Sequence, residues 1–162
     1  MTTRPGRLAE AARAGKGPLG HEIGFHRHWR DAPWDQGRWP NFQPAEFACR
    51  HCGQLYFDSR IFDAIQRVRA YMARPLRINS AHRCSVHNRR VGGAAHSRHL
   101  RLALDVDASD MDERQRRRLF ARCREAGFDA FGFYATFLHV DDRSGRRWWT
   151  EKGKETWSFL RA

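Results

Sequence analysis

Apolar residues recur at helical spacing in one stretch near the middle of the chain, "DSRIFDAIQRVRAYM" (58–72). Its apolar side chains lie three or four residues apart, which places them on one side of a helix: Ile61, Ile65, Val68 and Met72. Asp58 or Ser59 stands where a short polar side chain can accept a hydrogen bond from the first backbone N–H groups. The pattern therefore predicts a helix that packs one face against a core.

A second helical pattern, "DMDERQRRRLFARCREAG" (110–127), follows Ser109 as its expected N-cap and ends at Gly127. Between and after the two helices, short apolar runs predict strands: "PLRINSAHR" (75–83, running into a loop), "LALDVD" (102–107), "FGFY" (131–134) and "FLHVD" (137–141). Strands separated by helices, with short connections late in the chain, predict an α+β fold. We expect a small, mainly antiparallel sheet flanked by helices.

The first 40 residues lack such a pattern, because their Gly, Pro, Arg, His and Trp residues show no sustained period. We therefore expect a basic N-terminal arm over 1–40 and one folded domain over 41–162. A chain of 162 residues with 41% hydrophobic residues is long enough for a single domain with its own core. We expect it to be a monomer.

The charge of the chain points to polyanionic partners. Lys and Arg number 30 against 18 Asp and Glu, a net charge of +12, which favours nucleic acid, an anionic membrane surface or an anionic wall polymer without choosing among them. No stretch approaches the length of a membrane span, and the N-terminus lacks the apolar core of a secretory signal. We expect synthesis in the cytoplasm, so that any work outside the cell would need help with export or cell lysis.

Three residues have the types and spacing of a catalytic zinc site. His99 lies in a loop, Asp105 in the strand that follows and His139 in a later strand. Zinc in an enzyme takes three such ligands and keeps a position for water. Alternation along the strand puts Asp105 and Asp107 on the same face, so on geometry alone either could be the carboxylate ligand.

Two cysteines, Cys49 and Cys52, have the spacing of half a second, structural zinc site. Cys84 with His82 or His87 is the nearby supply of the remaining ligands. The alternative is a pair of buried, reduced thiols.

The segments "INSAHRCSVHNRRVGGAAHSRHLRLALDVD" and "FGFYATFLHVDDR" resemble the zinc D-alanyl-D-alanine carboxypeptidase family, whose Hedgehog-like fold also includes many phage endolysins. The resemblance covers about residues 40–149, because "FQPAEFACRHCG" is similar to the entry of the same domain. Its elements stand here in the family order: Ser80 and Arg83, Asn88 with Gly92 and Gly93, Ser97, His99, Ala103, Asp105, and His139 with Asp141.

The resemblance implies a zinc peptidase that cuts stem peptides of peptidoglycan, either as a D-Ala-D-Ala carboxypeptidase or as an endopeptidase of the endolysin type. Aligning on Ala103-x-Asp105 selects Asp105 as the ligand, with Asp107 as the alternative. A non-catalytic protein on the same fold, which contains zinc or binds nucleic acid or wall, is the competing hypothesis. The arginines at 114–118 and Trp148 with Trp149 would serve that nucleic-acid binding, although a solvated surface is the favoured interpretation of the arginines.

The general base is left open, because Thr136 and Phe137 stand where many members have Glu or His. Asp141 is the leading candidate, because strand alternation puts it on the same side as His139, and its alternative role is a carboxylate that orients a zinc histidine; His96 is the second candidate. The resemblance places Arg83 where the family has a substrate-binding arginine.

Three further residues complete the candidate site. Ser80 and Ser97 either donate hydrogen bonds to substrate or brace their loops. Tyr134 either stabilises an oxyanion or belongs to the core.

Overall fold

The main sheet has five strands in the order β3-β4-β6-β5-β7. The computed structural model describes residues 21–161. The strands are β3 (Ile78–Ser80), β4 (Leu104–Asp107), β5 (Ala130–Phe133), β6 (Phe137–Asp141) and β7 (Arg147–Trp149). Every neighbouring pair is antiparallel except β5 and β7, which run parallel. The predicted α+β class and mainly antiparallel sheet are confirmed.

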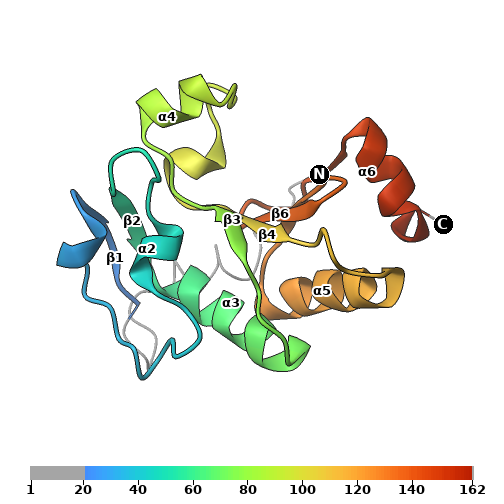
Figure 1. Cartoon of the computed structure of the whole chain (residues 1–162), viewed down its shortest axis with the longest axis horizontal. Helices are drawn as coiled ribbons and strands as arrows, with labels where there is room; N and C mark the ends of the chain where they lie inside the picture. Colours follow the sequence, from blue (N-terminus) through green and yellow to red (C-terminus); the bar gives the residue numbers. More distant parts are fainter. Residues whose placement is uncertain (1–20, 162) are drawn as a thin grey trace.

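Two long helices cover one side of this sheet. In Figure 1, α3 (Ser59–Met72) and α5 (Glu113–Ala126) lie side by side below the strands. Asp58 caps α3 by accepting a hydrogen bond from the backbone N–H of Arg60, as the sequence predicts. The N-cap of α5 is Asp112 and not the predicted Ser109. The side chains of Asp112 and Gln115 form a capping box, so the helix begins three residues later than the sequence pattern indicates.

Shorter elements surround these layers. They are α2 (Pro44–Phe47), α4 (Ser85–Arg90), α6 (Glu151–Thr156) and the 3₁₀ helices η1 (Trp29–Asp31), η2 (Arg98–Leu100) and η3 (Ser158–Leu160). In Figure 1, α4 and α6 project at opposite ends of the sheet.

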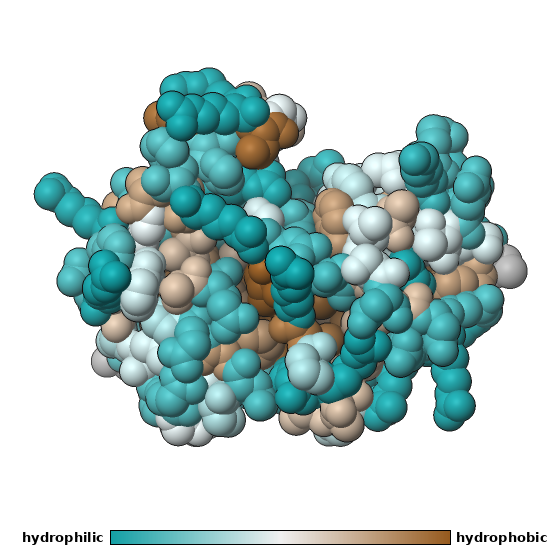
Figure 2. All heavy atoms as spheres, viewed as in Figure 1, coloured by the Kyte–Doolittle hydropathy of each residue, from teal (hydrophilic) through white to brown (hydrophobic). Residues whose placement is uncertain are grey.

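On the face shown in Figure 2, hydrophilic side chains predominate and hydrophobic residues gather near the centre. Among the described residues, no helix has the length and hydropathy to cross a bilayer.

The core is rich in aromatic side chains. Phe47, Phe57 and Phe62 are each at most 1% exposed. The ring centroid of Phe62 lies 4.8 Å from that of Phe47 and 5.0 Å from that of Phe57. Trp39 packs edge-on against Phe62 at 5.3 Å. Edge-on and tilted aromatic contacts of this kind add to the stabilisation from buried apolar area. The cluster fixes α2 and β2 (Leu55–Asp58) against α3.

The described part of the expected arm belongs to this cluster. Within residues 21–40, β1 (Ile23–His26) pairs antiparallel with β2, and Trp39 is 2% exposed. The Trp39 indole N–H donates to Asp63 at 2.9 Å, and Asp63 also pairs with Arg38. An extended arm over 21–40 is therefore wrong, because single aromatic anchors hold this irregular segment without any periodic pattern. Residues 1–20 lie outside the described part of the chain.

Two isoleucines test the packing of α3. Ile61 is 1% exposed and Ile23, on β1, is 50% exposed. Ile61→Ala is expected to lower the free energy of unfolding by about 2–5 kcal/mol through lost burial and a residual cavity. Ile23→Ala is expected to change it by less than about 0.5 kcal/mol. Chemical denaturation of the two variants measures both; equal losses would contradict the assigned core.

Candidate metal centre

Three buried side chains from separate elements meet at one point. Asp105 on β4 stands directly opposite His139 on β6 in the antiparallel register, and His99 reaches the same point from η2. The Nδ1 atom of His139 lies 2.8 Å from Oδ1 of Asp105, and Nε2 of His99 lies 3.2 Å from each of these atoms. All three residues are at most 6% exposed. The sequence-predicted set is thus brought together.

Backbone contacts fix the orientation of His99. Its Nδ1 atom lies 2.6 Å from the carbonyl oxygen of Ala81, so the Nδ1–H donates there and Nε2 keeps its lone pair toward the cluster. The Ser97 hydroxyl accepts a hydrogen bond from the His99 backbone N–H at 3.3 Å. The backbone N–H of Arg83 donates to the His99 carbonyl at 2.7 Å. Ser97 therefore braces the short turn that presents His99.

A carboxylate behind His139 orients that ring in the opposite sense. Nε2 of His139 lies 2.9 Å from Oδ2 of Asp141, which leaves Nδ1 to face Asp105. Asp141 is fully buried, and the Arg143 guanidinium donates to both of its oxygens, at 2.9 and 2.6 Å. This geometry matches the second role considered for Asp141, a carboxylate that orients a zinc histidine.

The three facing atoms fit zinc. Zn²⁺ binds imidazole nitrogen and carboxylate oxygen at about 2.0–2.2 Å, so two ligands at a tetrahedral angle lie about 3.3 Å apart. The separations here, 2.8 and 3.2 Å, are close to that value. Each histidine also donates its other ring N–H to an oxygen, the arrangement that holds metal-binding imidazoles in place. The donor set is therefore suited to one zinc ion.

Proton equilibria within the cluster reflect its tight contacts. Burial by itself raises the pKa of Asp105, but hydrogen bonds and charge from His139 and His99 outweigh it and hold that pKa well below its ordinary value. Burial likewise opposes the shift at Asp141, whose pKa falls because of Arg143 and then His139. Burial lowers the pKa of His139, and the bonds to Asp105 and Asp141 reverse this into a net rise. Both carboxylates are therefore ionised at neutral pH.

Arg83 contacts the second oxygen of Asp105 and is itself held by Ser80. The Arg83 guanidinium donates to Oδ2 of Asp105 at 3.0 Å and to the Ser80 hydroxyl at 2.8 Å. A guanidinium has five N–H donors, so Arg83 keeps several for a ligand. Asp107, the alternative carboxylate, lies outside the cluster and accepts a hydrogen bond from the Ser109 backbone N–H at 2.9 Å.

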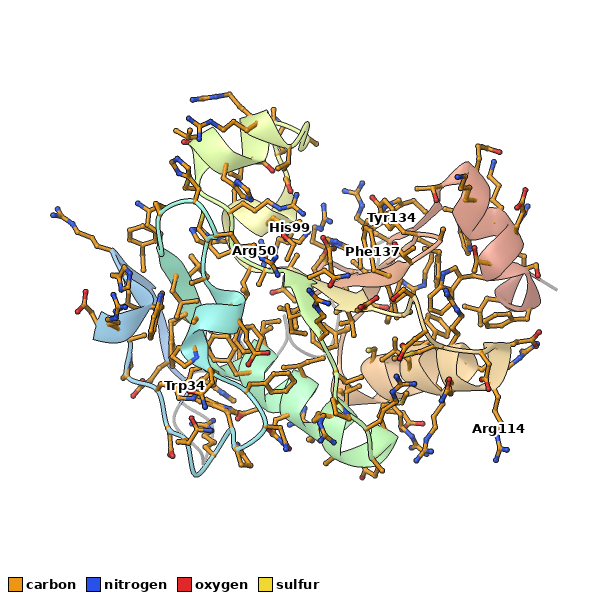
Figure 3. The ribbon with its side chains drawn as sticks, viewed as in Figure 1. Trp34, Arg50, His99, Arg114, Tyr134 and Phe137 are labelled. Carbon is orange, nitrogen blue, oxygen red and sulfur yellow. The ribbon has the colours of Figure 1, made fainter. Side chains whose placement is uncertain are left out.

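A pocket of about 640 Å³ opens above the cluster. His96 is exposed in its wall, and Tyr134 stacks on Phe137 with ring centroids 4.2 Å apart. Figure 3 shows Tyr134 and Phe137 set apart from His99, on the β5–β6 side. The Trp148 indole N–H donates to the Tyr134 hydroxyl at 3.4 Å. Tyr134 is therefore a wall residue whose hydroxyl is already placed by a hydrogen bond.

Sequence reasoning missed the arginines around this pocket. Arg98, Arg143 and Arg146 line it together with Arg83. Arg98 pairs with Asp142 at 2.5 Å and Arg143 with Asp141, so each of the consecutive acids of "HVDDR" holds an arginine of the pocket. The two adjacent aspartates followed by an arginine in "HVDDR" are the sequence feature from which these arginine pairs could have been predicted. Among the described residues that line the pocket, Asp105 is the only carboxylate.

The family comparison covers the His–Asp–His cluster of this site. Comparison with curated proteins and with solved structures finds no match. The family model described as Peptidase M15 matches residues 40–141, which span the three facing residues and end at Asp141. The match extends over more than half of the chain. The chain, with its Hedgehog/DD-peptidase-like fold and its His–Asp–His cluster, therefore belongs to the peptidase M15 family of zinc-dependent peptidases.

Proposed function

We propose that this protein hydrolyses peptide bonds in peptidoglycan stem peptides, with one zinc ion held by His99, Asp105 and His139. The observation that carries the proposal is the convergence of three oriented ligand atoms, 2.8–3.2 Å apart, at the floor of an arginine-lined pocket. Zinc, when bound, polarises the scissile carbonyl and lowers the pKa of a water molecule toward about 7. The residues around it bind the peptide and move protons.

His96 is the proposed proton carrier. Asp141 is unsuited to this task, because it is fully buried and both of its oxygens accept hydrogen bonds from Arg143. His96 is exposed in the pocket wall, and an imidazole ring can accept a proton and donate it again. In this proposal His96 accepts a proton from water as the peptide bond is attacked and passes it to the leaving amine. Asp141 acts as a positioning residue through His139.

The pocket's charge supports an anionic peptide as substrate. Arg83, Arg98, Arg143 and Arg146 face a site with a single lining carboxylate among the described residues. A planar guanidinium binds a carboxylate with two parallel hydrogen bonds. Arg83 is the proposed partner of a substrate carboxylate, since it retains free donors while fixed to Asp105. The Tyr134 hydroxyl is proposed to contact the substrate carbonyl, and Ser80 and Ser97 to act as braces.

The net charge of +12 supports action on an anionic cell wall, which we propose follows release of the protein during lysis.

The competing nucleic-acid interpretation has less support. Within the arginine run, Arg116 is buried against three backbone carbonyls, and Arg117 pairs with Glu113. Arg114 points away from the rest of the molecule (Figure 3). Arg116 and Arg117 therefore make contacts within the protein that stabilise α5.

Activity is tested on purified peptidoglycan with the zinc-loaded protein. Mass spectrometry of the released fragments is expected to find D-alanine, as a carboxypeptidase would give, or shortened stem peptides, as an endopeptidase would give. His139→Ala removes a ligand and is expected to abolish release, whereas His26→Ala, outside the pocket, is expected to retain it. No release from any wall type by protein with a full complement of zinc would overturn the proposal.

The positioning role of Asp141 is tested by Asp141→Asn. The amide is expected to weaken zinc binding about 10- to 100-fold, because it no longer supplies a charged acceptor for the His139 N–H. Titration against a competing chelator measures the affinity. Asp110→Asn, at an exposed carboxylate that pairs with Arg74, is the matched control and is expected to leave affinity unchanged. Unaltered zinc affinity in Asp141→Asn would contradict the assignment.

The role of His96 is tested separately. His96→Ala is expected to lower kcat by about 10²- to 10⁴-fold, since general acid–base catalysis is worth that range. Zinc content is expected to stay at the wild-type level, because His96 lies outside the ligand cluster. A kcat of His96→Ala equal to that of wild type would assign the proton transfer to another group.

A further inference from the structure

A second cluster of potential metal ligands lies outside the pocket. The Sγ atoms of Cys49, Cys52 and Cys84 all lie within 4.8 Å of one another. They come from two segments far apart in sequence, the turn after α2 and the residue that caps α4. All three are free thiols. A disulfide joins two cysteines, so one disulfide would not account for a cluster of three.

The turn that carries the first two thiols is tightly constrained. The Cys49 backbone N–H donates to the Gln54 carbonyl at 2.7 Å, and the Gly53 N–H donates back to the Cys49 carbonyl at 2.8 Å. Gly53 has φ of +76°, a conformation that favours glycine, and a Cβ there would lie 2.5 Å from the His28 ring. The Cys-x-x-Cys-Gly segment is therefore a preformed loop whose two thiols face Cys84.

Backbone N–H groups point at two of the sulfur atoms. The Cys84 N–H donates to Sγ of Cys49 at 3.3 Å, and the His87 N–H donates to Sγ of Cys84 at 3.4 Å. Hydrogen bonds to sulfur favour the thiolate, which is the form that binds metal. The cluster thus has both the donors and the surrounding hydrogen bonds of a metal site.

Two imidazoles stand beside the thiols. His51 and His87 stack with nearly parallel rings, 8° between their planes, and Nδ1 of His51 lies 3.6 Å from Sγ of Cys84. His87 follows Cys84 with the same spacing as Cys52 follows Cys49, which gives the pattern Cys-x₂-Cys and then Cys-x₂-His. This is the ligand pattern of structural Cys₃His zinc sites.

We propose that Cys49, Cys52 and Cys84, with His87 as fourth ligand, bind a second zinc ion whose role is structural. A site closed by four protein ligands has no open position for water, unlike the His–Asp–His cluster. The ion would tie the α2 turn to the start of α4. Arg83 immediately precedes Cys84 and binds both Asp105 and Ser80, so the tie would also restrain the pocket wall.

Zinc stoichiometry of the purified 162-residue chain tests this proposal without relying on activity. Wild type is expected to contain two zinc ions per chain by elemental mass spectrometry, and Cys84→Ser and His139→Ala one each. Cys123→Ala is the matched control, since Cys123 is a buried thiol outside the cluster, and it is expected to retain two. One zinc per chain in wild type, lost in His139→Ala, would overturn the proposal and leave the peptidase proposal intact.

Measurements on the wild-type protein keep the test valid if Cys84→Ser fails to fold. After exchange of zinc for cobalt, thiolate-to-metal charge-transfer absorption is expected in wild type and in His139→Ala. Absence of these bands, or an intact mass that shows a disulfide among the three cysteines, would overturn the site. His87→Ala is expected to weaken the second ion's binding and His51→Ala to leave it unchanged; the reverse result would overturn the assignment of His87.

Discussion

The direct pairing of Asp105 with His139 across β4 and β6 is the constraint on which the site depends. Residues opposite each other on antiparallel strands have their Cβ atoms about 4.5–5.5 Å apart, close enough for two short ligands to share one ion. A slip of one residue in either strand would turn that strand's ligand to the other face of the sheet, away from its partner. The apolar residues that alternate with them, Val106 and Val140, are fully buried and oppose such a slip.

A layer of charged partners surrounds this pair and completes its geometry. Asp141 and Arg143 stand behind His139, and Arg83 contacts Asp105. The carbonyl of Ala81 accepts the His99 N–H. Buried ions are costly unless paired, because leaving water costs several kcal/mol for each. Each buried carboxylate here therefore has a guanidinium partner. That arrangement leaves two nitrogens and one oxygen aimed at a common point beneath a basic pocket.

Much of the fold and the ligand set could be predicted from the sequence, and the reasons are local. Helix α3 has a full apolar stripe and an Asp58 cap, and β4 and β6 are short apolar runs whose alternation places Asp105 and His139. The structure of residues 21–40 could not be predicted, because isolated contacts such as that of Trp39 with Asp63 leave no period. Strand alternation alone leaves Asp105 and Asp107 equivalent. The alignment on Ala103-x-Asp105 favours Asp105, and the cross-strand register places Asp105 opposite His139. The arginine pairs of Asp141 and Asp142 and the approach of Cys84 to Cys49 also depend on tertiary contacts.

The central claim is that His99, Asp105 and His139 hold a zinc ion in a peptidase of the M15 family. Anomalous diffraction from crystals of the zinc-loaded protein, recorded on both sides of the zinc absorption edge, tests it most directly. The account predicts a zinc peak bonded to Nε2 of His99, a carboxylate oxygen of Asp105 and Nδ1 of His139, with Nε2 of His139 still bound to Asp141. A map without a peak at this point, or a zinc bound by Asp107 or Asp141 instead, would contradict it.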